Sequence, residues 1–256
     1  MLARMSAPTV VFMSDVHLGI DSMEQEAARE ARLLDFLRSL PGRAGSLYVV
    51  GDLFEFWFEY ATAIPRRYFA LLRALAEVRE RGVEITLLTG NHDFWLGRFL
   101  TDELGIHTVD GALALELQDR RIWLHHGDGL GGGDLGYRFL KRVLRNPASL
   151  AFYRWIHPDL GIPFALWASR WSRNSRGQQP LDGDRLFRQI AAPRFAERYD
   201  AVMIGHFHHV YERREGERSF FLLGDWFERF SYVELKQGEF EMCVWPEPAA
   251  TLAAAR

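Results

Sequence analysis

Five short clusters of residues that can bind metal ions or transfer protons recur along the chain. Each follows an apolar run typical of a β-strand, at residues 9–12, 47–50, 83–88, 122–124 and 201–204. Loops at the carboxyl ends of strands are where open sheets place their chemistry. Together the clusters can supply seven ligands to two metal ions. The five clusters are Asp15-Val16-His17, Gly51-Asp52-Leu53-Phe54-Glu55, Gly90-Asn91-His92-Asp93, His126-Gly127-Asp128 and Gly205-His206-Phe207-His208.

The first two clusters are rich in carboxylates. Asp15 and His17 are two residues apart, so on an extended strand end both side chains point to one side and can reach one ion. A chance surface Asp-x-His is the alternative for this pair taken alone. Asp52 follows Gly51, which allows a sharp turn off the strand. Because a carboxylate has two oxygens, we expect Asp52 to bridge two cations and Glu55 to orient neighbouring groups.

The remaining clusters add an amide oxygen and imidazole nitrogens. Asn91 after a glycine would by itself indicate an ordinary turn, yet its oxygen is a hard donor that suits Mn²⁺ or Mg²⁺. A single histidine after a strand is more often structural than a ligand. His126, His206 and His208 nevertheless recur with the carboxylates, and imidazole favours Mn²⁺, Fe²⁺ or Zn²⁺ over Mg²⁺. The mixed donor set therefore predicts two divalent ions, manganese first.

Two cations about 3.5–4 Å apart that share a carboxylate can hydrolyse phosphate esters and anhydrides, because they acidify a water and neutralise charge on phosphoryl oxygens. No side-chain nucleophile is required. The clusters therefore predict a phosphoryl-group hydrolase.

Size and composition restrict the context of this chemistry. The chain has 256 residues and a net charge of −3, so we expect one sheet-based α/β domain with no general attraction to nucleic acid. The single cysteine, Cys243, suggests a reducing compartment. The first residues lack the apolar stretch of a signal peptide or membrane span, which predicts a cytoplasmic protein.

Hydrophobic periodicity predicts the elements between the clusters. Amphipathic or capped helices are expected at residues 23–40, 65–81, 98–104 and 185–199, and an antiparallel strand pair at 112–117 and 121–125. Three further helices are expected at 137–144, 148–156 and 164–171. Residues 209–245 read as strands joined by tight turns, including Glu215-Gly216 and Gln237-Gly238.

The order of the motifs resembles that of the calcineurin-like metallophosphoesterases. Within that superfamily the chain resembles the UDP-2,3-diacylglucosamine diphosphatases of lipid A synthesis over nearly its whole length. Four stretches carry this closer resemblance: residues 14–18, residues 51–57, Asp134-Leu135-Gly136-Tyr137 and Arg173-Asn174-Ser175-Arg176. It implies a four-layer αββα sandwich spanning residues 1–256 as one domain, with a helical insert (a lid) at about residues 134–180.

The resemblance also implies roles for individual residues. One ion would be held by Asp15, His17, Asp52 and His208, and the other by Asp52, Asn91, His126 and His206. Asp52 and His92 would be catalytic. Substrate would contact Asn91, His92, Asp134, Tyr137, Asn174, Ser175 and His206. The better-known proteobacterial members have arginine where His92 stands. Histidine there is the usual superfamily residue and fits a general acid or a donor to a phosphate oxygen. No clear match to the family's remaining polar contacts follows Ser175, so the chain resembles a divergent branch.

The insert is unusually basic and aromatic. From residue 137 to residue 176 a single acid, Asp159, accompanies eight basic residues, and seven aromatic residues follow Tyr137. Such a segment is typical of one that lies on an anionic membrane or covers an acyl chain. An ordinary lid whose aromatics pack on the sheet is the alternative. Stacking on single-stranded nucleic acid would use the same residue types, but the acidic remainder of the chain disfavours it.

Three functions compete. The leading hypothesis is a peripheral pyrophosphatase on the cytoplasmic face of the inner membrane that cleaves UDP-2,3-diacylglucosamine, a nucleotide-linked glycolipid, to UMP and 2,3-diacylglucosamine 1-phosphate. The second is a soluble metal-dependent phosphodiesterase acting on nucleotides or nucleic acid ends. The third is a non-catalytic scaffold on the same fold, which the complete ligand set disfavours. The sequence does not indicate an oligomeric state.

Overall fold

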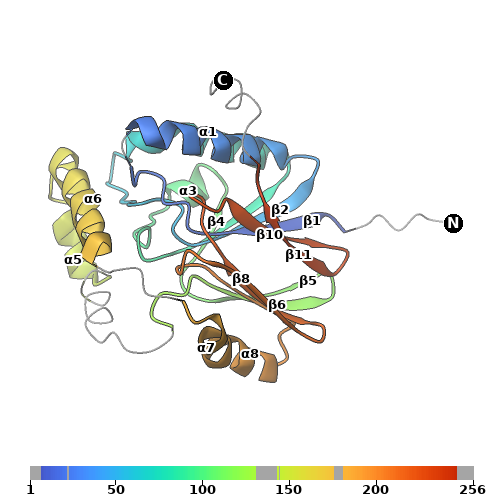
Figure 1. The fold of residues 1–256 in the computed structure, drawn as a ribbon. Coiled ribbons are helices and arrows are strands. Elements are labelled where there is room, and N and C mark those ends of the chain that lie inside the picture. Colours follow the sequence, from blue (N-terminus) through green and yellow to red (C-terminus); the bar gives the residue numbers. More distant parts are fainter. Residues whose placement is uncertain (1–6, 22, 131–142, 144, 176–180, 247–256) are drawn as a thin grey trace, which may run out of the picture.

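The computed structural model describes residues 7–21, 23–130, 143, 145–175 and 181–246. They form four layers, with two β-sheets face to face and helices on both outer faces (Figure 1). Separate apolar clusters fill the spaces between the first sheet and its helices, between the two sheets, and between the second sheet and its helices. The αββα sandwich that the resemblance implied is therefore confirmed.

The first sheet has the strand order β11-β10-β1-β2-β3-β4. Strands β1 to β4 are parallel, and β10 and β11 extend the sheet antiparallel. Val10 and Phe12 of β1 face the second sheet and Val11 faces the helices, which explains why the strand reads as a continuous apolar run. The strands are β1 (Thr9–Met13), β2 (Ala44–Val50), β3 (Glu84–Leu88), β4 (His107–Val109), β10 (Ser231–Lys236) and β11 (Glu239–Val244).

The second sheet has the order β5-β6-β7-β9-β8. Strands β6, β7 and β9 are parallel, whereas β5 and β8 pair antiparallel at the two edges. The predicted hairpin of β5 and β6 is confirmed. The strands are β5 (Leu113–Leu117), β6 (Arg120–His125), β7 (Ala201–Ile204), β8 (Val210–Glu215) and β9 (Arg218–Leu223).

The helices of the sandwich follow the predicted order with shifted ends. On the first sheet lie α1 (Met23–Ser39), α2 (Phe69–Glu80) after a 3-10 turn (Arg66–Tyr68), and the short α3 (Phe99–Asp102). The helix expected near residues 185–199 is confirmed, but its ends are shifted and a π-helical turn interrupts it. It comprises α7 (Gly183–Leu186), the π-helical turn (Phe187–Ala191) and α8 (Ala192–Ala196). Pro193 has no N–H to continue an α-helical ladder, and a π-turn accommodates such a break.

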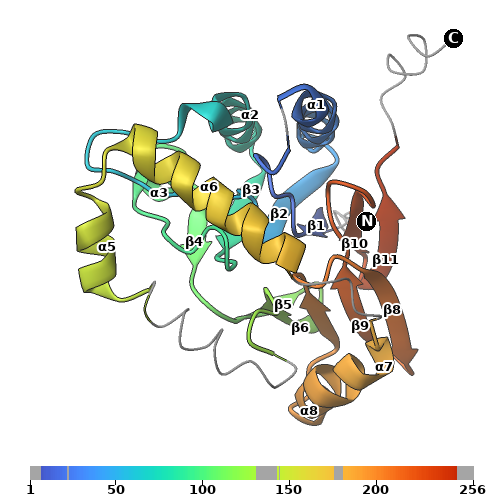
Figure 2. The same cartoon turned by 60° about the vertical axis from the view of Figure 1, so that its left-hand side comes forward.

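The described part of the insert is a pair of helices beside the carboxyl ends of β1, β2 and β3 (Figure 2). They are α5 (Pro147–Tyr153) and α6 (Pro158–Ser175). Helix α6 begins six residues before the predicted helix and continues through Pro163, whose missing N–H removes one backbone hydrogen bond from the helix. The helix expected at 137–144 falls outside the described residues except for Val143. No described helix is long and apolar enough to cross a bilayer.

Candidate metal centre

The clusters that follow β1, β2, β6 and β7 meet at one edge of the sandwich. Asp15, His17 and His208 bring one ligand atom each within 4.8 Å of one another, and so do Asp52, His126 and His206. Parallel neighbouring strands present their carboxyl ends on the same side, so loops far apart in sequence converge there. The structure thus brings together six of the seven predicted ligands in two adjacent groups.

Left-handed backbone aims these side chains. The φ angles are 55° at Asp15, 48° at His17, 53° at Asp52, 70° at His206 and 51° at His208. The expectation that Asp15 and His17 lie on an extended strand end is therefore wrong, because β1 ends at Met13 and both residues turn away from the sheet. Left-handed backbone costs non-glycine residues about 1–3 kcal/mol each and is concentrated at functional sites.

The loops after β1 and β2 remain tied beyond the ends of the strands. The Val16 and His17 amides both donate to the Asp52 carbonyl, at 2.9 and 3.0 Å. Gly51 has φ 86°, and a Cβ there would lie 2.3 Å from His126 Nδ1. A Cβ on Gly90 would lie 2.0 Å from Asp52 Oδ1. Glycine is therefore required at both positions for the ligand side chains to approach the backbone so closely.

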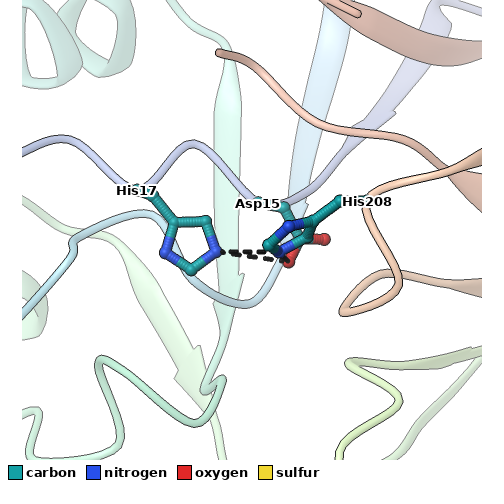
Figure 3. A group of neighbouring side chains, drawn as sticks. All are labelled: Asp15, His17 and His208. Atoms are coloured by element: carbon teal, nitrogen blue, oxygen red, sulfur yellow. Dashed lines mark hydrogen bonds and ion pairs between the residues drawn. The ribbon is translucent and has the colours of Figure 1, made fainter. Parts of the chain in front are cut away.

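In the first group, the imidazole nitrogens of His17 and His208 lie around Asp15 Oδ1, one of the two oxygens of that carboxylate. Asp15 Oδ2 accepts hydrogen bonds from Ser14 Oγ at 2.6 Å and from the His206 amide at 2.7 Å. The other oxygen, Oδ1, is buried and accepts no hydrogen bond from the described residues. It faces Nε2 of His208 at 3.2 Å and Nε2 of His17 at 3.6 Å (Figure 3). These two nitrogens are themselves 3.1 Å apart.

A buried glutamate sets the tautomer of His17. Its Nδ1 lies 3.0 Å from Glu55 Oε2, a carboxylate oxygen that can only accept, so Nδ1 carries the proton. Neutral His17 then presents a bare Nε2 towards Asp15. Glu55 thus has the orienting position expected for it, in an arrangement common among metal-bound histidines. Lone pairs of His17 and Asp15 face each other in buried space, which fits a shared cation.

In the second group, a backbone carbonyl sets the tautomer of His126 in the same way. His126 Nδ1 donates to the Val50 carbonyl at 3.0 Å, which leaves Nε2 bare in the neutral ring. This Nε2 lies 3.1 Å from Asn91 Oδ1 and 3.1 Å from Asp52 Oδ2. Asn91, the seventh predicted ligand, is thereby brought to the same place. Three electron-pair donors converge here as well.

Asp52 lies between the two groups. Its Oδ2 is 3.1 Å from His126 Nε2 and 3.5 Å from His17 Nε2, while Oδ1 accepts from the His92 amide at 2.9 Å. A third possible group, His17, Glu55 and His92, offers no separate ion site, since there Glu55 is already hydrogen-bonded to the protonated Nδ1 of His17. The arrangement of the described residues therefore fits two cations that share the Asp52 carboxylate.

The pKa values of the histidines show that the metal-free centre favours positive charge. Burial alone would lower the pKa of His17, but the charge of Asp52 and the contacts with Asp15 and Glu55 raise it to about 10. His126 behaves alike: burial opposes protonation, and Asp52 raises its pKa to about 10. Burial together with the His126 charge lowers the pKa of His206 to about 4. Protons on His17 and His126 thus take the place that cations would occupy.

Two further residues hold the centre together, Asp93 of the third cluster and Ser169. Asp93 accepts from the amides of Gly90 at 2.8 Å and Leu53 at 2.7 Å, and so joins the loops after β2 and β3. Burial and the nearby Asp52 raise the pKa of Asp93 to about 6. Ser169, from α6, contacts both Glu55 and His92. The Gly-Asn-His-Asp spacing could have pointed to Asp93, whereas no local pattern marks Ser169.

Only some of the predicted substrate contacts lie within the described structure. His92 lies at the rim of the centre, where its ring is 4.7 Å from that of His17, and its Nδ1 donates to the Glu55 carbonyl at 3.1 Å. Asn174 and Ser175 form the last turn of α6, but their side chains are outside the described structure. Asp134 and Tyr137 also lie outside the described residues.

Comparison with known proteins agrees with this geometry. The calcineurin-like phosphoesterase family profile matches residues 8–210. The chain belongs to this family of metal-dependent phosphoesterases, and its His/Asp groups are typical of members that use two metal ions.

Relatives share most of its length. It is 32% identical to a UDP-2,3-diacylglucosamine hydrolase of Porphyromonas gingivalis, over 88% of this chain and 92% of the relative. It is 33% identical to a protein of the same name from Aeromonas salmonicida, over 90% and 91% of the two chains. A solved archaeal phosphodiesterase has a TM-score of 0.44 and 13% identity, covering 92% of this chain and 99% of its own.

Proposed function

We propose that the chain is a hydrolase with two divalent metal ions. Asp15, His17, Asp52 and His208 hold one ion, and Asp52, Asn91, His126 and His206 hold the other. The observation that carries the proposal is the position of Asp52 Oδ2, which faces Nε2 of both His17 and His126. The buried Asp15 Oδ1, which accepts no hydrogen bond from the described residues, supports it further.

Manganese fits this donor set best. Oxygen ligands from Asp15, Asp52 and Asn91 suit hard cations, whereas four imidazole nitrogens disfavour Mg²⁺. When bound, the two cations supply an acidified water and neutralise charge on the phosphoryl oxygens. The chain's own residues orient the ligands: Glu55 acts on His17, the Val50 carbonyl on His126, and Ser14 on Asp15.

We propose UDP-2,3-diacylglucosamine as the substrate. The name of the two relatives and the apolar helices beside the centre support this choice. Water oxygen bonds to the α-phosphorus, and the bond from that phosphorus to the bridging oxygen breaks. The products are UMP and 2,3-diacylglucosamine 1-phosphate. His92 stands at the rim, where its ring can donate a proton or a hydrogen bond to a phosphoryl oxygen. Asn91, His206 and the last turn of α6 with Asn174 and Ser175 complete the proposed substrate contacts, together with Asp134 and Tyr137.

The insert has one face buried on the sandwich and one exposed apolar face, and the exposed face supports a lipid substrate. Leu166 of α6 is buried on an aromatic cluster formed by Phe56, Phe58 and Tyr60, with Tyr153 of α5 packed against it. The opposite side is exposed, with Leu160, Phe164 and Trp167 on α6, Phe152 on α5 and Trp155 in the turn after α5. Packing on the sandwich, the alternative considered for the insert, therefore accounts for only some of its aromatic side chains.

This exposed apolar face suits contact with a membrane surface. Trp155 is 89% exposed, and the basic residues Arg154, which directly follows α5, and Arg170 of α6 are exposed as well. Apolar side chains flanked by arginines bind anionic lipid surfaces. We therefore propose that the chain acts as a single domain, peripherally on the cytoplasmic face of the inner membrane, where its lipid substrate would lie.

The direct test is incubation of purified protein with UDP-2,3-diacylglucosamine and Mn²⁺. Release of UMP, lost on adding EDTA and restored by excess Mn²⁺, is the expected result. Cleavage of a chromogenic phosphodiester without UMP release would contradict the substrate but keep the phosphoesterase. Absence of both activities in protein that binds two Mn²⁺ would contradict the proposed function.

A further inference from the structure

A hydroxyl of the insert reaches the residues that orient the metal centre. Ser169 lies on α6, and its Oγ is 2.5 Å from Glu55 Oε1 and 3.1 Å from His92 Nδ1. Glu55 precedes Ser169 by 114 residues and belongs to the loop after β2. The contact therefore joins the insert to the sandwich at the metal site.

The direction of these hydrogen bonds follows from the chemistry of the three groups. A buried carboxylate accepts only, so the Ser169 hydroxyl donates to Glu55 Oε1. His92 Nδ1 faces the Glu55 carbonyl as well as Ser169 Oγ, so Nδ1 carries a proton that both oxygens share. Ser169 thus donates to Glu55 and accepts from His92 at the same time.

Glu55 relays the contact to a proposed ligand. Its Oε1 is held by Ser169 and its Oε2 by His17 Nδ1, and the residue is 1% exposed. A carboxylate held at both oxygens cannot rotate without breaking one of these bonds. Loss of the Ser169 bond would therefore loosen the orientation of His17.

The position of Ser169 depends on how α6 is seated. Leu166, three residues earlier, is 7% exposed on the aromatic cluster with Phe56 and Phe58, and Ile162 packs there too. Ile162, Leu166 and Ser169 recur at helical spacing on one face. The exposed residues Leu160, Phe164 and Trp167 occupy the other face. Seating of the inner face thus places the hydroxyl at Glu55.

We propose that Ser169 is a positioning residue through which docking of α6 completes the metal centre. The inference rests on the proposed two-metal function and adds to it a link between the insert and the ligands. The hydrogen bond from Ser169 to Glu55 fixes the orientation of His17, and the hydrogen bond between Ser169 and His92 fixes the His92 ring at the rim of the centre. Binding energy of a ligand beneath the insert would thereby be coupled to the affinity for metal, and the coupling is reciprocal.

The test compares Ser169→Ala with Ser169→Thr, which keeps the hydroxyl, and with Ser149→Ala, a serine on α5. Mn²⁺ affinity is measured by calorimetric titration, and kcat and KM with bis(p-nitrophenyl) phosphate. We expect Ser169→Ala to weaken Mn²⁺ binding about threefold to tenfold and to lower kcat by about tenfold, with KM unchanged. Ser169→Thr should restore both values, and Ser149→Ala should match the wild type.

A role limited to seating the insert would give another result. Ser169→Ala would then keep the wild-type Mn²⁺ affinity and diester kcat, which overturns the proposal, as would equal impairment of Ser169→Ala and Ser169→Thr. The titration needs no turnover, so a protein that binds two Mn²⁺ but releases no UMP would overturn the substrate and leave the Ser169 comparison decisive. A wild type that binds no Mn²⁺ would overturn both proposals.

Discussion

The metal centre and the insert differ in how far their side chains are exposed to solvent. Asp15 and Asp52 at the centre are almost fully buried, and left-handed backbone and hydrogen bonds hold them in place. The insert leaves Trp155 and Phe164 largely exposed. Groups that perform chemistry must be held before substrate arrives, whereas a surface that receives an apolar molecule stays open to it. The difference suggests that chemistry and substrate choice are built from separate parts, joined at Ser169.

Loss of Asp52 should have the largest effect, because it removes a ligand from both proposed ions. Asp52→Ala is expected to abolish hydrolysis and to lower bound metal, measured by elemental analysis after loading with Mn²⁺. Asp119→Ala is the matched control, since Asp119 has a similar φ of 63° in an exposed turn. Full metal content in Asp52→Ala would break the assignment of a shared carboxylate.

His92 should affect rate without affecting metal. His92→Ala is expected to lower kcat by about 10²–10⁴-fold, because it removes a proton or hydrogen-bond donor at the rim. Bound Mn²⁺ should remain at the wild-type amount. His107→Ala, at an exposed position on β4, serves as the control. An unchanged kcat would make His92 a bystander.

The metal-free centre should destabilise the fold at high pH. His17 and His126 have folded pKa values of about 10, above the ordinary 6.5, so their stabilisation is full below about pH 6.5 and is lost as pH rises to about 10. Thermal unfolding in EDTA should therefore shift down by several degrees across this window. With Mn²⁺ the loss should disappear, because metal requires the unprotonated rings. A flat profile in EDTA would contradict this account.

The exposed face of the insert should matter least for chemistry. Trp167→Ala is expected to raise KM for the acylated substrate and to weaken sedimentation with anionic vesicles by roughly tenfold, given the apolar area lost. The kcat for a small diester should not change. Phe69→Ala removes an equally exposed aromatic residue from α2 and is the control. Equal losses in both variants would argue against a specific role for the insert.

Much of the centre could be predicted from local sequence. Apolar runs before Asp15, Asp52 and His126 indicated strands, and a strand followed by polar ligand residues predicts a site at a sheet edge. The order of the motifs and the resemblance they carry indicated the two-sheet sandwich. These properties are local, because strand propensity and ligand chemistry depend on neighbouring residues in the chain.

Other features depended on packing. The left-handed backbone of Asp15 and His17 arises where loops from different strands pair, and no pattern of residue types reveals it. The contact of Ser169 with Glu55 spans 114 residues and exists only because α6 docks on the sandwich. The sequence by itself therefore determined which donors the chain offers and in what order. The tertiary structure decided which atoms of these donors meet and which side chains hold them, because contacts between distant residues follow from packing of the whole fold.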